Sequence, residues 1–394
     1  MKRIILISLL SWPYFSFSQG NKYVINGRMD KIDVPTKIYL TTVIDDVMTM
    51  DSTTITDHQF HFEGTVEGPI KASLFINNIQ PNDKAPITIQ YKNNIRIFVL
   101  EPCEIKVSGK DLLKNASVSS KINDQEKSYR ALLKDATKTM DKMELQIATM
   151  RAEKKNDPEK EQELYVRYQL SLNARKMLQQ KYISEHKKSF YSLFALEEIA
   201  GYTYDPVSVS AIFETLDPSV KNTLEARLFK EELDRGMNLL IGAKAPDFEV
   251  KELKSGKIVK LSDFIGKYIL LDFWATYNNY SRSAHQVMAE TYKQYADSNF
   301  TIISITVDPP AEKNAILEAI NKDQMVWTNL GDPSHQRNDA AKTYNILTLP
   351  QVYLIDNNGN IFNKNFPIDS LKTELTKMRY PKPETAETTS ESSN

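Results

Sequence analysis

The stretch YILLDFWATYNNYSR, residues 268–282, decides the fold of the C-terminal part of this 394-residue chain. Its first half is an apolar run that ends at Trp274, as expected for a strand buried inside a sheet. Its second half carries Asn278 and Ser281, two residue types whose side-chain oxygens cap the free N–H groups at a helix start. The stretch therefore predicts a buried strand, a short loop and a helix that begins near Asn279.

Two more apolar runs predict further strands of the same sheet. They are FTIISITV, residues 300–307, and VYLID, residues 352–356. Each follows the previous strand after enough residues for a crossover connection. We therefore expect an α/β domain over residues 241–380 that folds alone, with a central mixed sheet flanked by helices.

These segments resemble, in chain order, the TlpA-type thioredoxin-like family, which is close to the peroxiredoxins and redoxins. IGAKAPDFEV resembles the family's opening strand, FTIISITVDP its central parallel strand, and YNILTLPQVYLIDNNGNI the loop before its cis-proline with the strand and turn that follow. Pro350 falls at the cis-proline position, so the resemblance implies a cis bond between Leu349 and Pro350. It also implies that the main chain before this proline pairs with an extended polypeptide.

The chain departs from this family at the active-site motif. The usual W-C-x-x-C becomes Tyr277-Asn278-Asn279-Tyr280-Ser281. Dithiol–disulfide exchange needs one thiol that attacks as a thiolate and a second thiol that resolves the mixed disulfide. Asn278 stands at the attacking position and Ser281 at the resolving position, and neither side chain can exchange sulfur. We therefore expect no catalytic residue in this loop.

The same resemblance indicates which residues would line a substrate groove. We expect part of the aromatic surface of the loop to face it, and the candidate binding residues are Trp274, Tyr277, Asn279, Tyr280, Leu349 and Pro350. Asp272 matches the buried carboxylate that accepts a proton from the family's resolving thiol. Because that thiol is missing, we interpret Asp272 as a hydrogen-bonded strand carboxylate without a catalytic role.

Three functions are compatible with these residues. The first is a non-redox binding or scaffold protein of the cell envelope, whose partner is an extended polypeptide or an envelope protein. The alternative is a thiol-disulfide oxidoreductase or peroxidase of the TlpA or AhpC/TSA type. A third hypothesis is that Ser281 activates a bound thiol ligand, by analogy with serine-using transferases on this fold. None of these readings requires a cofactor, and we predict none.

The only cysteine of the chain is Cys103, in LEPCEIKVSG, so no intramolecular disulfide can form. We interpret it as a turn residue between two strands, because no neighbouring base in the sequence would lower the pKa of its thiol. His58 and His61 are three apart in a predicted strand and would point to opposite faces, so we predict no metal site there.

The remaining chain is predicted to fold as an all-β domain over residues 19–116 and a helical region over residues 117–240. The β segment resembles a small domain of unknown function often fused to thioredoxin-like domains. Apolar residues of the helical region alternate at spacings of four and three, at Tyr129, Leu133, Ala136, Met140, Met143, Ile147 and Met150. This seam and the turn at Asp157-Pro158 predict an antiparallel helical hairpin, with shorter helices after Asp205-Pro206 and Asp217-Pro218.

The two ends of the chain are predicted to lie outside the folded domains. Residues 1–18 have a basic start, a short apolar run and a small-x-small end at Ser16 and Ser18, which predicts a cleaved signal peptide and an exported protein. That run is too short to span a membrane. The family resemblance suggests a Gram-negative bacterium, in which the compartment would be the periplasm. Residues 381–394 lack apolar periodicity and are predicted to be disordered. The formal net charge is −1 with both signs interspersed, so no nucleic-acid surface is expected, and the oligomeric state stays open.

Overall fold

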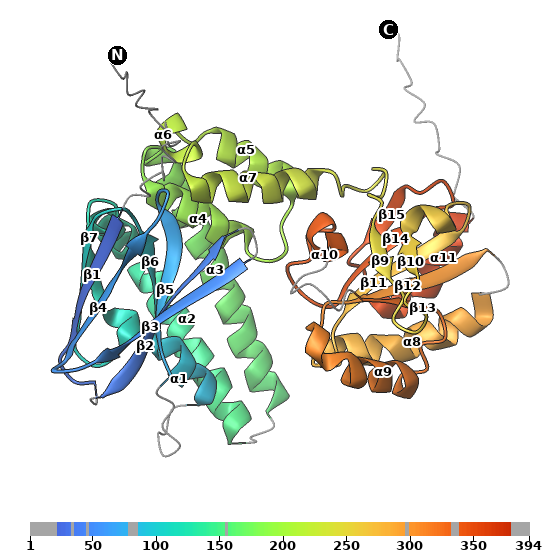
Figure 1. Ribbon diagram of the computed structural model, residues 1–394, viewed down its shortest axis with the longest axis horizontal. Coiled ribbons are helices and arrows are strands. Elements are labelled where there is room, and N and C mark those ends of the chain that lie inside the picture. Colours follow the sequence, from blue (N-terminus) through green and yellow to red (C-terminus); the bar gives the residue numbers. More distant parts are fainter. Residues whose placement is uncertain are drawn as a thin grey trace, which may run out of the picture. The chain divides into compact units, whose positions relative to one another are not determined.

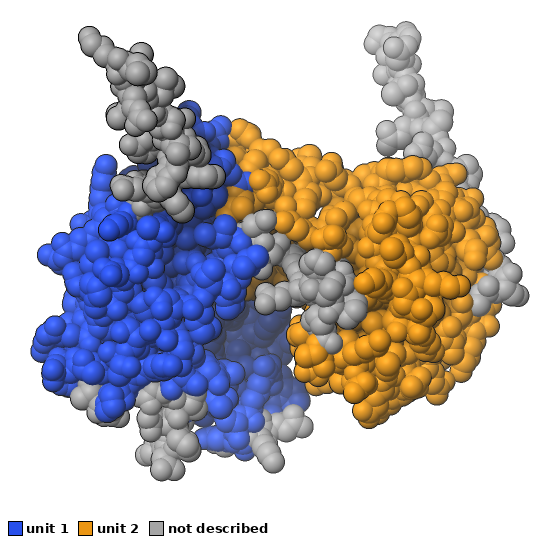
Figure 2. Space-filling view, viewed as in Figure 1, with its two compact units in different colours: residues 1–195, 217–227 blue, residues 196–216, 228–394 orange. Residues whose placement is uncertain are grey.

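The computed structural model describes residues 22–32, 35–44, 47–77, 86–153, 157–295, 299–331 and 339–379. The chain divides into two compact units (Figure 2). The first unit comprises Met1–Ala195 with Asp217–Arg227, and the second comprises Leu196–Leu216 with Leu228–Asn394. The predicted signal peptide and tail lie outside the described residues. No described helix combines the length and the apolar character needed to cross a membrane.

The N-terminal part of the first unit is an all-β domain, as predicted. Its strands are β1 (Lys22–Met29), β2 (Thr36–Ile44), β3 (Val47–Ile55), β4 (Gln59–Thr65), β5 (Ile70–Ile76), β6 (Ile95–Leu100), β7 (Glu104–Gly109) and β8 (Ser117–Ser119), with α1 (Ile87–Asn93), η1 (Leu113–Asn115) and η2 (Asn123–Gln125) between or after them. They form two four-stranded sheets, ordered β4-β1-β7-β8 and β3-β2-β5-β6. Side chains alternate between the two faces of a strand, and the inward set forms one apolar core that includes Ile25, Leu74 and Phe98. β8 lies beyond residue 116, the position at which the sequence predicted the end of the β domain.

The predicted helical hairpin is confirmed by α2 (Glu126–Ala152) and α3 (Pro158–Glu185). Asp157 caps α3, because its Oδ1 accepts a hydrogen bond of 2.9 Å from the backbone N–H of Lys160. The seam residues Tyr129, Leu133, Met140 and Met143 of α2 are buried. The shorter helices follow as α4 (Phe190–Ala200), α5 (Pro206–Glu214), α6 (Pro218–Lys221) and α7 (Leu224–Met237), and Asp205 and Asp217 cap α5 and α6 as expected.

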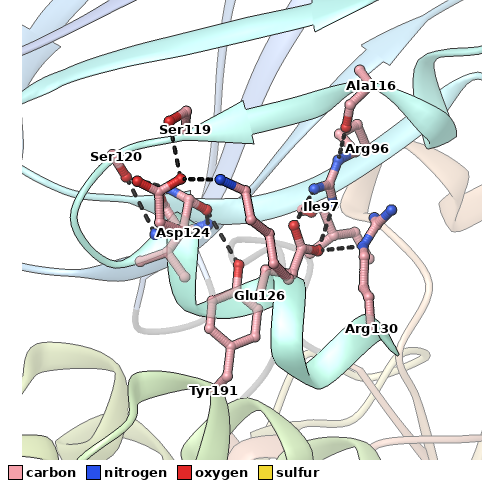
Figure 3. Close-up of polar contacts among 12 residues, drawn as sticks. Arg96, Ile97, Ala116, Ser119, Ser120, Asp124, Glu126, Arg130 and Tyr191 are labelled. Atoms are coloured by element: carbon pink, nitrogen blue, oxygen red, sulfur yellow. Dashed lines mark hydrogen bonds and ion pairs between the residues drawn. The ribbon is translucent and has the colours of Figure 1, made fainter. Parts of the chain in front are cut away.

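A buried ion pair fastens the hairpin to the β domain (Figure 3). Arg96 of β6 is 3% exposed and donates to the carbonyl oxygens of Ala116, at 2.8 Å, and Ile97. Its guanidinium also binds both carboxylate oxygens of Glu126, the first residue of α2. The more exposed Arg130, one turn along α2, donates to the same carboxylate at 2.7 Å. The Glu126 charge is therefore held between two arginines at the start of the helix.

The C-terminal part of the second unit contains the predicted mixed sheet (yellow to red in Figure 1). The sheet consists of β11 (Tyr268–Trp274), β12 (Phe300–Thr306), β13 (Thr328–Leu330), β14 (Gln351–Ile355) and β15 (Ile361–Lys364). Before it, β9 (Glu249–Lys251) and β10 (Ile258–Lys260) form a two-stranded sheet of their own. The helices of this domain are α8 (Asn279–Tyr295), α9 (Lys313–Lys322), α10 (Asp339–Thr343) and α11 (Leu371–Arg379). Three short 3-10 helices, η3 (Leu261–Phe264), η4 (Pro310–Glu312) and η5 (Ile368–Ser370), complete it.

β11 is the central strand of the five-stranded sheet β13-β12-β11-β14-β15. It pairs in parallel with β12 and antiparallel with β14. One face of the sheet packs on α8, α9 and α11 through residues such as Leu270, Met288 and Leu375. The other face is covered by α10 and by the chain before β11, through residues such as Phe248 and Tyr344. The end of β11, and with it the start of α8, is therefore supported from both sides.

Candidate functional site

The loop between β11 and α8 is closed by the side chain of Asn278. Its Oδ1 accepts a hydrogen bond of 2.9 Å from the backbone N–H of Ser281, so the predicted cap of α8 by Asn278 is confirmed. Its Nδ2 donates to the backbone carbonyl of Leu349 at 3.2 Å. The bond between Leu349 and Pro350 is cis, also as predicted. Asn278 therefore joins the helix start to the chain before the cis-proline, and both its polar atoms are engaged.

A second contact fixes the other side of this loop. Asp308, just after β12, is buried and accepts hydrogen bonds from the backbone N–H of Thr276, at 2.8 Å, and from its hydroxyl, at 2.7 Å. The hydroxyl of Thr306 donates to the same carboxylate at 2.6 Å. The four-residue connection from Trp274 to Asn279 is thus tied to β12 and to the cis-proline segment.

The exposed part of the loop is aromatic. Tyr277 is 69% exposed and Tyr280 is 79% exposed, and both Asn279 and Pro350 are exposed as well. The expectation that Trp274 contributes to this surface is wrong. Trp274 is fully buried, because it lies on the central strand and its ring packs edge-on against the ring of His285 at 4.9 Å between centroids. Any groove surface consequently depends on the two tyrosines.

Ser281 lies on the opposite, interior side of the first helical turn. Its side chain is fully buried, so the hypothesis that it activates a bound thiol ligand is contradicted by its enclosure. The expectation that it caps the helix is also wrong, because Ser281 lies inside α8 and the cap is Asn278. The two positions that carry the dithiol in the family therefore differ here: position 278 is half-buried at the surface and position 281 is enclosed.

Asp272 is buried and hydrogen-bonded, as the sequence predicted. Its Oδ2 accepts a hydrogen bond of 2.8 Å from the hydroxyl of Ser304 on β12. That hydroxyl in turn accepts a hydrogen bond of 2.8 Å from the indole N–H of Trp327. The carboxylate therefore belongs to a short polar chain inside the apolar core on this face of the sheet.

A buried histidine, which was not predicted from the sequence, lies beside this carboxylate. His285 is fully buried on α8, with Nδ1 2.9 Å from Asp323 Oδ2 and Nε2 3.5 Å from Asp272 Oδ2. Arg282 also binds the Asp323 carboxylate through two nitrogens. The sequence spacing could have indicated this position, because His285 follows Ser281 by four residues and so lies on the same face of the helix. Arg282, His285, Asp272 and Asp323 therefore form a compact cluster of two basic and two acidic side chains behind the loop.

The cluster shifts two protonation equilibria. Burial lowers the pKa of His285, but the close contacts and the charges of the Asp272 and Asp323 carboxylates raise it by more, so the net shift is upward. Burial raises the pKa of the Asp323 carboxyl, but Arg282 and His285 outweigh that effect and hold the pKa below its usual value. Both shifts favour the charged forms of the two side chains.

We expect the stability of this domain to fall at mildly alkaline pH because of His285. The folded-state pKa of His285 lies above its unfolded value of about 6.5, so its contribution is fully present below that pH and is lost as pH rises through the folded pKa. Each unit of pKa shift corresponds to about 1.4 kcal/mol. Urea unfolding from about pH 6 to about pH 9 should therefore show a decline in the wild type that is absent in His285→Gln.

The matched control for this titration is His61→Gln, which removes an exposed imidazole from the first unit. The free energy of unfolding of each variant is compared with the wild type at every pH. Equal declines in the wild type and in His285→Gln would show that the buried imidazole carries no pH-linked stability.

The other candidate residues do not join this site. Cys103 is half-buried in the turn between β6 and β7, as predicted, and burial together with Glu101 raises the pKa of its thiol. His58 is not in a strand, contrary to expectation: it occupies the turn before β4 with a φ of 62°, and only His61 lies in β4. Within the described ranges, no group of three or more His, Cys, Asp or Glu side chains is arranged to hold a metal ion.

A central β11, a capped helix start and a cis-proline beside it define a thioredoxin-like domain. A model of the AhpC/TSA family matches residues 241–364, and a domain of unknown function (DUF4369) matches residues 23–127. The chain is 30% identical over 152 residues to the thiol-disulfide oxidoreductase ResA of Bacillus cereus, covering 38% of this chain and 80% of that protein. It is 33% identical over 121 residues to the thioredoxin-like protein YneN of Bacillus subtilis, covering 30% and 68%.

Among solved structures, the thioredoxin domain of a thiol-disulfide oxidoreductase from Bacteroides vulgatus is 30% identical, with a TM-score of 0.33, and covers 35% of this chain and 97% of that chain. The chain belongs to the thioredoxin-like thiol-disulfide oxidoreductase family, to which it adds the N-terminal β domain and the helical region. The one cysteine of the chain is Cys103, outside the thioredoxin-like domain, so the loop between β11 and α8 contains no thiol.

Proposed function

We propose that this protein is an exported, non-redox binding protein of the cell envelope, and that its thioredoxin-like domain holds an extended polypeptide. The observation that carries the proposal is the bonding of Asn278. Its carboxamide caps α8 and binds the Leu349 carbonyl, so the position of an attacking thiolate holds a neutral group that maintains the loop. Membership of an oxidoreductase family then reflects the scaffold, and the chemistry that requires two thiols is lost.

The binding surface in this proposal is the exposed side of the loop. The Leu349 carbonyl already accepts one hydrogen bond from Asn278, so a bound segment has only its second lone pair to use. Recognition therefore rests mainly on Tyr277 and Tyr280, two rigid amphipathic rings that offer apolar area and a hydroxyl each. Such a surface suits an extended chain with apolar or aromatic side chains.

The N-terminal residues support the proposed location. Lys2 and Arg3 precede an apolar run that ends before the small residues Ser16 and Ser18, a pattern typical of a secretory signal peptide. In a Gram-negative cell, export would bring the mature protein into the periplasm, among other envelope proteins. A partner from that compartment is therefore part of the proposal.

The competing function is that of a thiol-disulfide oxidoreductase, the name that several relatives carry, or of a peroxidase. Its one available thiol would be Cys103 in the first unit. Burial and the charge of Glu101 raise the pKa of that thiol, which disfavours the thiolate that either reaction needs. The binding function is therefore the better supported of the two.

The proposal is tested with a displayed library of unstructured peptides, selected on the full-length protein without its leader. The affinity of a selected peptide should fall about tenfold or more in the variant with Tyr277→Ala and Tyr280→Ala, since each aromatic contact contributes about 0.5–1.5 kcal/mol and about 1.4 kcal/mol is tenfold. Tyr202→Ala is the matched control, because Tyr202 is 76% exposed and lies outside the loop. Failure to select any peptide, or equal affinity in the double variant, would refute this surface.

A further inference from the structure

Four polar atoms in the interior of the thioredoxin-like domain have no hydrogen-bond partner among the described residues, although Nε2 of His285 also lies in ion-pair range of Asp272. They are Oδ1 of Asp272, Nε1 of Trp274, Oγ of Ser281 and Nε2 of His285, and each belongs to a fully buried side chain. Within the part of the chain that the structure describes, no group hydrogen-bonds to any of them. Leaving a buried donor or acceptor unpaired is costly, and four at one place are unusual for a native core.

The four atoms come from two elements that face each other. Asp272 and Trp274 are two residues apart on β11, so their side chains lie on the same face of the sheet. Ser281 and His285 are four residues apart on α8, so theirs lie on the same face of the helix. The His285 ring touches both strand residues: it packs on the Trp274 ring at 4.9 Å, and Nε2 is 3.5 Å from Asp272 Oδ2. The set therefore gathers at the first turns of α8, behind the exposed loop.

The chemistry of these atoms selects one kind of occupant. The indole of Trp274 is a donor, the carboxylate of Asp272 is an acceptor, and the hydroxyl of Ser281 is both. Each ring nitrogen of His285 faces a carboxylate, Nδ1 that of Asp323 and Nε2 that of Asp272, so we assign Nε2 as a donor too. A cation would be repelled by the two donors, and an anion by Asp272. A small neutral molecule with two donors and two acceptors satisfies all four, and water is the smallest one.

We propose that these four side chains form a built internal hydration site that holds one water molecule. The water accepts from Trp274 and His285 and donates to Asp272 and Ser281, which is within the number of hydrogen bonds that buried waters make. It thereby bridges β11 to the first two turns of α8. The site is independent of any partner bound at the exposed tyrosines, because it lies on the interior side of the helix.

The second buried indole in the same core provides a matched control. Trp327 Nε1 donates to the Ser304 hydroxyl at 2.8 Å, so its hydrogen is already paired with protein. The experiment uses the ¹⁵N-labelled full chain, and the indole NMR signals are assigned from Trp→Phe variants. Rotating-frame cross-relaxation with water should be observed at the Trp274 indole hydrogen and should be absent at the Trp327 indole hydrogen. A water signal at neither indole, or at both, would overturn the proposal.

A substitution of Ser281 separates a bound water from a dry, apolar packing defect. Ser281→Val removes one partner and fills space with methyl groups. If the site is hydrated, the variant should lose the water signal at Trp274, and its folding equilibrium constant should fall about tenfold or more, given the unpaired groups it leaves. If the space is dry, filling it should leave the equilibrium constant unchanged or raise it, which contradicts the proposal. Should the variant not fold, the comparison of the two wild-type indoles still decides.

Discussion

The double variant Asn278→Cys with Ser281→Cys is expected to form an intramolecular disulfide and to gain a slow disulfide reductase activity. The two positions lie one turn apart at the start of α8, a separation within the Cα range that disulfides span. Position 278 is half-buried at the surface and position 281 is enclosed, which suits an attacking thiol and a resolving thiol. The helix N-terminus lowers the pKa of the first thiol. The activity should stay slow, because removing Asn278 also removes the cap, at a cost of about 1 kcal/mol.

Thiol counting after mild oxidation and insulin reduction measure the two outcomes. All variants carry Cys103→Ala, so that no other sulfur contributes. The single variant Asn278→Cys is the control, since it has an attacking thiol and no resolving partner. If the two introduced thiols remain free, the loop does not have disulfide geometry, and the segment Tyr277-Asn278-Asn279-Tyr280 is a binding surface with its own backbone shape.

Replacing Arg96 by alanine is expected to destabilise the first unit by about 3–5 kcal/mol. The reason is that Glu126 would keep a buried charge without its main partner, and the Ala116 carbonyl would lose its donor. Urea unfolding followed by far-UV circular dichroism measures the change. The matched control is Arg130→Ala, which contacts the same carboxylate with a side chain that is 48% exposed, and should cost less than about 1 kcal/mol.

A further variant distinguishes the ion pair from simple loss of packing. Arg96→Met combined with Glu126→Leu removes both charges, and its stability should recover much of what Arg96→Ala loses. If Arg96→Ala costs no more than Arg130→Ala, the buried pair is not what fastens the hairpin to the β domain.

The sequence predicted those features of the site that depend on neighbouring residues. Asn278 was identified as a cap because its bond to the Ser281 N–H closes within one helical turn. The strand before it was identified because a buried central strand needs a continuous apolar run. Pro350 was placed by its position in a motif, and the cis bond confirms it.

The features that the sequence did not reveal depend on partners far along the chain. His285 pairs with Asp323, 38 residues away, and Arg96 pairs with Glu126, 30 residues away. No local pattern specifies which carboxylate meets which cation. The exposure of Trp274 was predicted wrongly for a related reason: an aromatic residue suits both a core and a groove, and only the packing of α8 on β11 places it in the core.

The central claim is that the thioredoxin-like domain has kept its scaffold and lost disulfide exchange. Insulin reduction by the purified protein and by its Cys103→Ala variant tests this claim most directly, with a dithiol-containing thioredoxin as the positive control. We predict that both proteins remain at the background rate, because Asn278 and Ser281 offer no exchangeable sulfur. Turnover in both proteins would show that another group has replaced the dithiol. Turnover abolished by Cys103→Ala would place the chemistry in the first unit, and either result would contradict a non-redox protein.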